Sequence, residues 1–280
     1  MKKTLALLLA GLMTLGMFAG CGSKEKEYAN QLEKVLDQGY ITMATSPDWA
    51  PYEFQDLNKT GQDAIVGCDI ELAKYIADYI GVELKIEAMD FDSAQAAVGL
   101  GTAEFSIAGY GYTDERAQLY LLSDYYNFNT TDDAQCLIVR KGEGAALKTA
   151  DDFKGLKVGA QNGSLQMGLV TNQLPGAVVT PITALPTAIM MLTTSKDLDA
   201  VACAGDTANQ FIDNYKGSIE KAEFKLEYFS EGSVILGKKG ETELMAKINE
   251  ALKKAADEGM YEVWMKDAIA LADSLGVETN

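Results

Sequence analysis

Short runs of apolar residues alternate along the chain with longer segments in which apolar residues recur every three or four positions. The first pattern predicts β-strands and the second predicts amphipathic helices, and their alternation is typical of an α/β fold. Gly81 is placed to end the first helix. The pattern predicts a strand–helix–strand–helix–strand unit over 41–45, 69–80, 82–89, 93–100 and 104–108.

The same order of elements recurs after a polar stretch. Thr149 and Asp152 can form a capping box for a short helix, and Ser164 can cap the next helix. The other predicted elements are strands over 136–140, 157–160, 178–182 and 200–203 and a helix over 185–193. The chain then returns through predicted strands over 226–229 and 234–236 to a long helix over 241–257.

Two similar sets of elements, with the chain crossing between them twice, predict two lobes joined by a hinge. Each lobe is expected to hold a sheet rich in βαβ units with flanking helices. We place the first part of lobe 1 at 38–134, lobe 2 at 135–228, and the return to lobe 1 with a C-terminal helix at 229–280.

The N-terminus has the layout of a secretory signal peptide. Two lysines precede an uncharged, mostly apolar run over 5–20, which is too short for a comfortable membrane span. Cys21 follows small residues and resembles the cysteine of a bacterial lipoprotein box, which is lipidated and becomes the mature N-terminus. We expect a signal peptide over 1–20, a lipidated Cys21 and a flexible tether up to residue 37. An uncleaved N-terminal anchor is the alternative.

Composition narrows the possible functions. The net charge of −17 repels phosphate backbones, so we expect no nucleic-acid partner. The chain has no histidine, which removes the commonest general base and the commonest metal ligand. Cys68, Cys136 and Cys203 are an odd number of thiols in apolar stretches, so we expect small hydrophobic residues and no disulfide framework.

Several stretches resemble, in the same order, the family 3 extracellular solute-binding proteins, which are the polar amino-acid receptors of ABC importers. The resemblance extends from about residue 40 to the terminal helix, and it implies a two-lobe fold of the periplasmic-binding-protein type II. The similar stretches are 44–54, 66–72, 89–91, 108–116, 123–126, 153–164 and 199–201.

The resemblance implies that Arg116 holds the α-carboxylate of a ligand. Thr113 can cap the helix that follows it, which places Arg116 in the first turn, and a guanidinium can grip a carboxylate with two parallel hydrogen bonds. Ser164 and the backbone amide of Leu165 are expected to bind the same carboxylate, because amides at a helix start favour an anion. An ordinary surface arginine and a plain helix cap are the alternatives.

Aromatic residues are expected to enclose the body of the ligand. In the family, the positions of Trp49 and Phe91 sandwich the ligand, although aromatic residues in apolar runs are also common in cores. Gly109 is expected to let the backbone approach the ligand closely. Tyr110 flanks the site and could offer a π-face to a cation or simply pack. Gln161 is expected to contact the ligand as well.

Three positions depart from the family pattern. Gly111 stands where a Ser or Thr hydroxyl is usual, and Ser46 stands where many members have an acidic residue. Ala204 occupies the position of the acid that usually holds the α-ammonium, and Asp206 is the nearest replacement. We therefore count Ser46, Gly111 and Asp206 as ligand-binding residues and leave the identity of the ligand open.

The resemblance implies a substrate-binding protein of an ABC importer, which captures an amino acid or a close analogue by its carboxylate between the lobes. We expect a monomer that partners a transporter permease, is anchored to the bacterial membrane by its N-terminal lipid, and has no cofactor, metal or catalytic residue. One alternative is an enzyme similar to cyclohexadienyl dehydratase, for which Glu53 and Asp48 are the nearest carboxylates. Another is a ligand sensor without transport.

Overall fold

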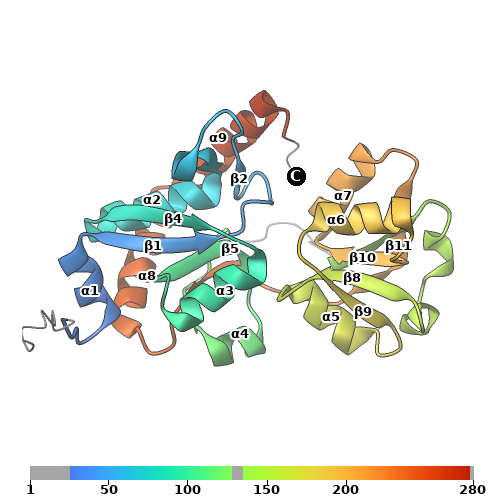
Figure 1. Cartoon of the computed structure of the whole chain (residues 1–280), viewed down its shortest axis with the longest axis horizontal. Helices are drawn as coiled ribbons and strands as arrows, with labels where there is room; N and C mark the ends of the chain where they lie inside the picture. Colours follow the sequence, from blue (N-terminus) through green and yellow to red (C-terminus); the bar gives the residue numbers. More distant parts are fainter. Residues whose placement is uncertain (1–25, 128–134, 278–280) are drawn as a thin grey trace, which may run out of the picture.

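The protein was analysed as a computed structural model, which describes residues 26–127 and 135–277. Two five-stranded sheets lie in two lobes side by side, and helices cover both sheets (Figure 1). This arrangement confirms the α/β class and the two lobes predicted from the sequence. The proposed signal peptide, Cys21 and the first residues of the tether fall outside the described residues.

The sheet of the first lobe has the strand order β4-β1-β5-β12-β6. Its strands are β1 (Tyr40–Thr45), β4 (Glu83–Ala88), β5 (Phe105–Gly111), β6 (Leu121–Leu122) and β12 (Ser233–Gly237). Strand β1 runs parallel to β4 and β5, whereas β12 is antiparallel to β5. The returning strand β12 therefore completes a sheet that the earlier part of the chain began. A two-stranded sheet, β2 (Phe54–Gln55) and β3 (Ile65–Val66), lies apart from it.

Helices pack against the first sheet and form a hydrophobic core with it. They are α1 (Gln31–Gln38), α2 (Cys68–Ile80), α3 (Phe91–Leu100), α4 (Asp114–Leu119), α8 (Thr242–Asp257) and α9 (Met260–Leu275). Ile41 and Phe105 of the sheet and Ile76 and Ile248 of the helices are fully buried in one cluster. Burial of such side chains contributes about 1.5–3 kcal/mol each, so this core provides a rigid support for the strand ends.

The sheet of the second lobe has the order β11-β7-β10-β8-β9. Its strands are β7 (Gln135–Arg140), β8 (Lys157–Gln161), β9 (Val178–Ile182), β10 (Ala200–Cys203) and β11 (Ile219–Leu226). The main helices are α5 (Leu165–Gln173), α6 (Leu185–Met190), which continues as a π-helical turn over Met191–Ser195, and α7 (Gly205–Asn214). The predicted capping box of Thr149 and Asp152 opens a short 3₁₀ turn, Ala150–Phe153.

Two segments join the sheets. The chain leaves the first sheet after β6, enters the second at β7, and returns between β11 and β12. Tyr126 and Ser233 pair by two backbone hydrogen bonds of 2.9 Å, so the outgoing and returning segments support each other. The lobe boundaries at 134/135 and 228/229 stay a proposal, which this strand distribution supports. No helix of the described residues is long and apolar enough to cross a membrane.

Most predicted elements agree with the structure to within a few residues, but the strand predicted over 226–229 is wrong. The strand is β11, which ends at Leu226, and Phe229 is 86% exposed. Glu220 and Lys221 are adjacent charged residues that interrupt the alternation at the start of β11 and hide its strand pattern in the sequence. The sequence analysis also missed α1, α7 and α9.

Candidate functional site

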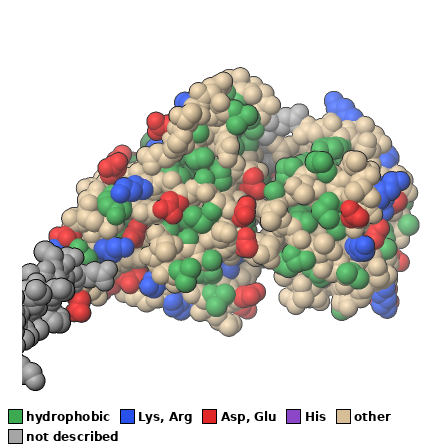
Figure 2. Space-filling model, in the orientation of Figure 1, with side chains coloured by type: hydrophobic (Ala, Val, Ile, Leu, Met, Phe, Trp, Pro, Cys, Tyr) green, Lys and Arg blue, Asp and Glu red, His purple; other side chains and the backbone are tan. Residues whose placement is uncertain are grey.

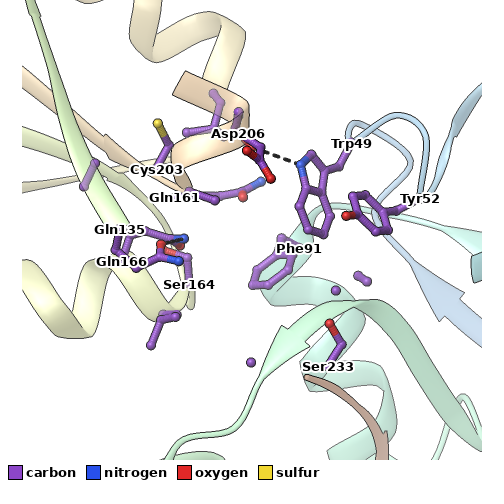
Figure 3. Close-up of a pocket in the computed structure, with 18 of the residues that line it drawn as sticks. Trp49, Tyr52, Phe91, Gln135, Gln161, Ser164, Gln166, Cys203, Asp206 and Ser233 are labelled. Atoms are coloured by element: carbon purple, nitrogen blue, oxygen red, sulfur yellow. Dashed lines mark hydrogen bonds between the residues drawn. The ribbon is translucent and has the colours of Figure 1, made fainter. Parts of the chain in front are cut away.

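A cavity of about 460 Å³ lies between the lobes, and both lobes line it. This volume is in the range that suits a small metabolite. We call it the inter-lobe cavity. In Figure 3 one side carries Trp49, Tyr52, Phe91 and Ser233, and the other carries Gln135, Gln161, Ser164, Gln166, Cys203 and Asp206.

Arg116 lies in the cavity wall because of a local cap. Thr113 precedes α4, and its Oγ1 accepts a 3.0 Å hydrogen bond from the Arg116 backbone N–H, as the sequence predicted. The guanidinium, with 5% of the residue exposed, donates to the carbonyl oxygens of Gly111 at 2.7 Å and Gly163 at 3.0 Å. Its Nε donates to Gln95 Oε1 at 3.4 Å. Gly111 belongs to the first lobe and Gly163 to the second, so Arg116 contacts both.

The charge of Arg116 has no carboxylate partner among the described residues. The chain has one other arginine, Arg140, and that side chain pairs with Glu143 at 3.0 Å and Asp199 at 3.2 Å. Arg116 instead lies 5.3 Å from the ring centre of Tyr110, and burial lowers its pKa. A buried cation without an anion is costly, and three hydrogen bonds leave two of the five N–H groups of a guanidinium available. The site is therefore suited to binding an anion.

The N-terminus of α5 faces the same space. Ser164 Oγ accepts a 3.1 Å hydrogen bond from the Met167 N–H, which confirms the predicted cap. The first N–H groups of a helix have no acceptor within the helix, so those of Leu165 and Gln166 remain beside the cavity. Together with Arg116 they provide donors from both lobes for one carboxylate.

Aromatic side chains form the opposite wall. Trp49 stacks on Tyr52 with ring centres 4.1 Å apart, and Phe91 lies below them in Figure 3. The indole Nε1 of Trp49 donates to Thr207 Oγ1 across the cavity at 3.0 Å. Trp49 and Phe91 thus line the cavity as predicted, whereas Tyr52, which lies in the same similar stretch 44–54, was not among the predicted site residues.

Three acidic residues line the cavity, and they differ in their partners. Asp48 accepts hydrogen bonds from Ser46 at 3.0 Å and Gln161 at 3.2 Å, and burial raises its pKa. Glu53 is buried beneath the aromatic wall. Asp206 makes no hydrogen bond or ion pair with any described residue, and in Figure 3 it lies beside Trp49. Asp206 is therefore the acid best placed to accept a cationic group.

The structure corrects two of the predicted site residues. Tyr110 is fully buried, and its hydroxyl lies 2.9 Å from Ser106 Oγ, because side chains alternate along β5 and Gly109 and Gly111 face the cavity instead. Its ring packs against the guanidinium of Arg116. Ser46 is also buried outside the cavity lining, where it orients Asp48. Both residues support other site residues and do not reach the cavity themselves.

Polar residues that the sequence analysis missed come from the second lobe and the crossings. Gln166 donates to Gln135 at 2.7 Å, and both side chains point into the cavity (Figure 3). Tyr228 lines the cavity and donates to the carbonyl of Tyr112 across the lobes at 2.9 Å. Phe229 follows Tyr228 and also lines the cavity. Two neighbouring aromatic residues outside a core element are a signal in the sequence that could have indicated a binding site.

Hydrogen bonds between α3 and the loop before α5 join the two lobes beside the cavity. Asn162 donates to Asp92 at 2.5 Å, and Gln95 donates to the Gly163 carbonyl at 3.1 Å. On the face in Figure 2, acidic side chains lie along the boundary between the lobes. The structure therefore describes a closed arrangement in which a ligand would be enclosed. Among the described residues, no group of three or more Cys, Asp and Glu side chains is arranged to hold a metal ion.

Gly109 fixes the distance between β5 and the aromatic wall. Its φ is +57°, and a Cβ there would lie 2.0 Å from Trp49 Cζ3. We expect Gly109→Ala to displace Trp49 and weaken ligand binding about tenfold or more, a loss of ~1.4 kcal/mol. Gly142→Ala is the matched control, because Gly142 also has a positive φ, +91°, but open space around it. Both variants carry the strain of a positive φ, but only Gly109→Ala adds a clash at the cavity, so equal affinities in a titration would contradict this role of Gly109.

A buried carboxyl pair lies under the cavity floor. The pKa of Glu53 lies well above its usual value, mainly because the side chain is buried. The charges of Asp69 and Asp48 and a hydrogen bond to Asp69 raise it further. Asp69 accepts hydrogen bonds from Tyr126 at 2.9 Å and Tyr261 at 2.6 Å. Because these hydroxyls already donate to Asp69, we assign the shared proton to Glu53.

The pair predicts a pH dependence of stability. The folded state binds the Glu53 proton more tightly than the unfolded state. The stability that this proton contributes is therefore lost as the pH rises above about 4.5 toward the raised pKa. Glu53→Gln keeps a neutral donor toward Asp69. As the pH rises through that window, the free energy of unfolding of Glu53→Gln should increase relative to the wild type by up to ~1.4 kcal/mol per pH unit.

Urea unfolding between pH 4.5 and 8 would measure this difference. Glu220→Gln is the control that should stay parallel to the wild type in this window, because the hydrogen bond from Lys141 lowers the pKa of Glu220 and its contribution is lost only as the pH falls below about 4.5. A Glu53→Gln curve that stays parallel to the wild type would show that Glu53 ionises normally.

Comparisons with known proteins agree with this geometry. The family model of bacterial extracellular solute-binding proteins, family 3, matches residues 41–267. The arginine-binding extracellular protein ArtP of Bacillus subtilis is 34% identical over 167 residues, 59% of this chain and 58% of that protein. The L-cystine-binding protein TcyJ of Escherichia coli is 28% identical over 257 residues, 91% of each chain.

Solved structures share the same fold. An amino-acid ABC transporter substrate-binding protein, AbpA from Streptococcus pneumoniae, was solved bound to L-arginine. It superposes with a TM-score of 0.74 and is 30% identical, over 88% of this chain and all of that one. The predicted two-lobe fold of the periplasmic-binding-protein type is therefore confirmed.

Proposed function

Because this chain belongs to the bacterial extracellular solute-binding proteins of family 3, we propose that it captures an α-amino acid or a close analogue for an ABC importer. The ligand lies in the inter-lobe cavity with its carboxylate on Arg116, Ser164 and the amide of Leu165. The observation that carries the proposal is the buried guanidinium of Arg116, which contacts both lobes and has no carboxylate partner among the described residues.

Other groups would hold the rest of the ligand. Asp206 would accept the α-ammonium, because it is the cavity acid without another partner in the described structure. Trp49 and Phe91 would cover the body of the ligand and exclude water, which strengthens the polar contacts. Gln161 and the backbone at Gly109 and Gly111 would complete the enclosure. The two curated relatives are named for different amino acids, arginine and cystine, so we leave the side chain of the ligand open.

Binding would couple to lobe closure. A ligand that contacts both lobes at once binds the closed form more tightly and shifts the population toward it. A transporter permease would then distinguish closed from open receptors. The chain would act as a monomer, held outside the cytoplasm at the bacterial membrane by a lipid on Cys21 after removal of residues 1–20. It would use no cofactor and no catalytic residue.

One observation favours a second candidate function. Glu53 lines the cavity with a raised pKa, and a carboxyl group that keeps its proton can act as a general acid. An enzyme similar to cyclohexadienyl dehydratase would need such a donor. The hydrogen bond to Asp69 occupies this proton, which favours the binding role.

A thermal-shift screen separates the two functions. A ligand that binds only the folded state at 100 times its Kd stabilises the protein by ~2.7 kcal/mol. We expect a clear rise in Tm with one or a few L-amino acids, and no turnover of prephenate or arogenate. Turnover of either compound would replace the binding role with the enzymatic one. The absence of a permease gene next to the gene of this chain would favour a ligand sensor without transport.

A further inference from the structure

Two thiols lie opposite each other in the sheet of the second lobe, and one of them lines the inter-lobe cavity. Cys136 of β7 and Cys203 of β10 are direct partners across an antiparallel pair of strands. They are 3% and 1% exposed, and their side chains share a hydrogen bond. Cys203 lines the cavity, where Figure 3 shows its sulfur on the wall of the second lobe.

The strand register brings the two cysteines to a backbone spacing that a disulfide can span. Residues directly opposite on antiparallel strands have Cα atoms about 4.5–5.5 Å apart, and a disulfide requires roughly 4.4–6.8 Å. The two side chains also lie on the same face of the sheet, because direct partners across strands point the same way. The register therefore gives the pair a Cα spacing within the range of a disulfide.

The surroundings favour thiolate chemistry at one member of the pair. The hydrogen bond from Cys203, and then the nearby Lys221 and Lys225, lower the pKa of Cys136. Lys225 lies directly opposite Cys136 on β11. Cys68 differs, because burial raises its pKa and it lies in the first lobe, away from the other two thiols.

We propose that Cys136 and Cys203 are a covalent modification site that closes to a disulfide in the cavity wall by exchange with a small external disulfide. One thiolate attacks a sulfur of the external disulfide, releases one thiol and forms a mixed disulfide. The second thiolate attacks the protein sulfur of that bond, releases the second thiol and forms the internal Sγ–Sγ bond. Two electrons and the two thiol protons pass from the pair to the external disulfide, which becomes two thiols.

A disulfide between Cys136 and Cys203 would constrain the second lobe next to the ligand. Cys203 is followed by α7, whose first turn carries Asp206. A bond to Cys136 would tie the start of α7 to β7 and close a long loop of chain, which stabilises a fold mainly through the unfolded state. An extracytoplasmic location, as proposed above, makes such oxidants available.

The test uses the whole chain, purified with reductant and then incubated folded with oxidised glutathione. Peptide mapping without reduction should find Cys136 linked to Cys203, and Tm should rise by about 5–15 °C. Dithiothreitol should reverse both changes. Cys68→Ala should behave like the wild type, whereas Cys136→Ala and Cys203→Ala should show neither the link nor the rise.

The wild-type measurement decides the proposal even if a variant fails to fold. Oxidised protein in which Cys136 and Cys203 are both still open to alkylation after unfolding would overturn it. A link that includes Cys68, or a glutathione adduct on Cys136 or Cys203 with no internal bond, would overturn it as well.

Discussion

Arg116→Ala is expected to reduce the affinity for a carboxylate ligand about 10³-fold, because it removes two charge-assisted hydrogen bonds in a water-excluded cavity. The fold should remain, since the guanidinium makes no ion pair with a described residue. Its charge contacts only carbonyl oxygens, an amide oxygen and aromatic rings. Isothermal titration would measure the affinity and urea unfolding the stability. Arg116→Lys should recover part of the loss, because an ammonium keeps the charge but lacks the planar fork.

The chain offers a matched control in its other arginine. Arg140→Ala removes the ion pairs with Glu143 and Asp199 and the hydrogen bonds to the carbonyls of Leu192 and Leu198. It should lower the stability of the second lobe and leave the affinity nearly unchanged, because Arg140 lies outside the cavity lining. An Arg116→Ala protein that binds within tenfold of the wild type would remove Arg116 from the site.

Asp206→Asn is expected to weaken binding of an α-amino acid about 10²-fold, because it removes the carboxylate that faces the ammonium group in an enclosed cavity. Binding of the corresponding 2-hydroxy acid, which has no ammonium group, should change little. Titration of both ligands against both proteins would separate this contact from a general disturbance of α7.

Asp213→Asn serves as the control for Asp206→Asn. Asp213 is an exposed residue near the end of the same helix, so the substitution makes the same change of charge away from the cavity. It should leave both affinities unaltered. If Asp206→Asn weakens the 2-hydroxy acid as much as the amino acid, Asp206 supports the helix and does not hold the ammonium.

Local patterns predicted the elements that are strongly amphipathic or wholly buried. The helix over 69–80 agrees with α2, and the strand over 200–203 coincides with the wholly buried β10. In β11 the adjacent charged residues Glu220 and Lys221 interrupted the alternation, and α7 has few apolar positions to mark a helix. Periodicity detects an element only when burial divides its residues clearly between inside and outside.

Short capping motifs determined the geometry of one part of the candidate site. Thr113 and Ser164 revealed helix starts, and these helix starts placed Arg116 and Leu165 correctly beside the cavity. Tyr110 was misplaced because its orientation depends on which face of β5 meets the core.

Contacts between distant parts of the chain were not visible in the sequence. Glu53 meets Asp69 through a buried contact between a loop and α2, and Cys136 meets Cys203 through the order of strands in the second sheet. An odd number of cysteines suggested three unrelated small hydrophobic residues. The strand register instead brings two of them together.

The most direct test of the account compares an amino acid that binds with its own α-carboxamide. The two molecules share the ammonium group, the side chain and nearly the same shape, and they differ in the negative charge that Arg116 and the start of α5 are proposed to bind. Calorimetric titration of the wild-type protein should show binding of the acid and a loss of about 10³-fold or more for the carboxamide. Equal affinities for the two would contradict the claim that a carboxylate joins the lobes.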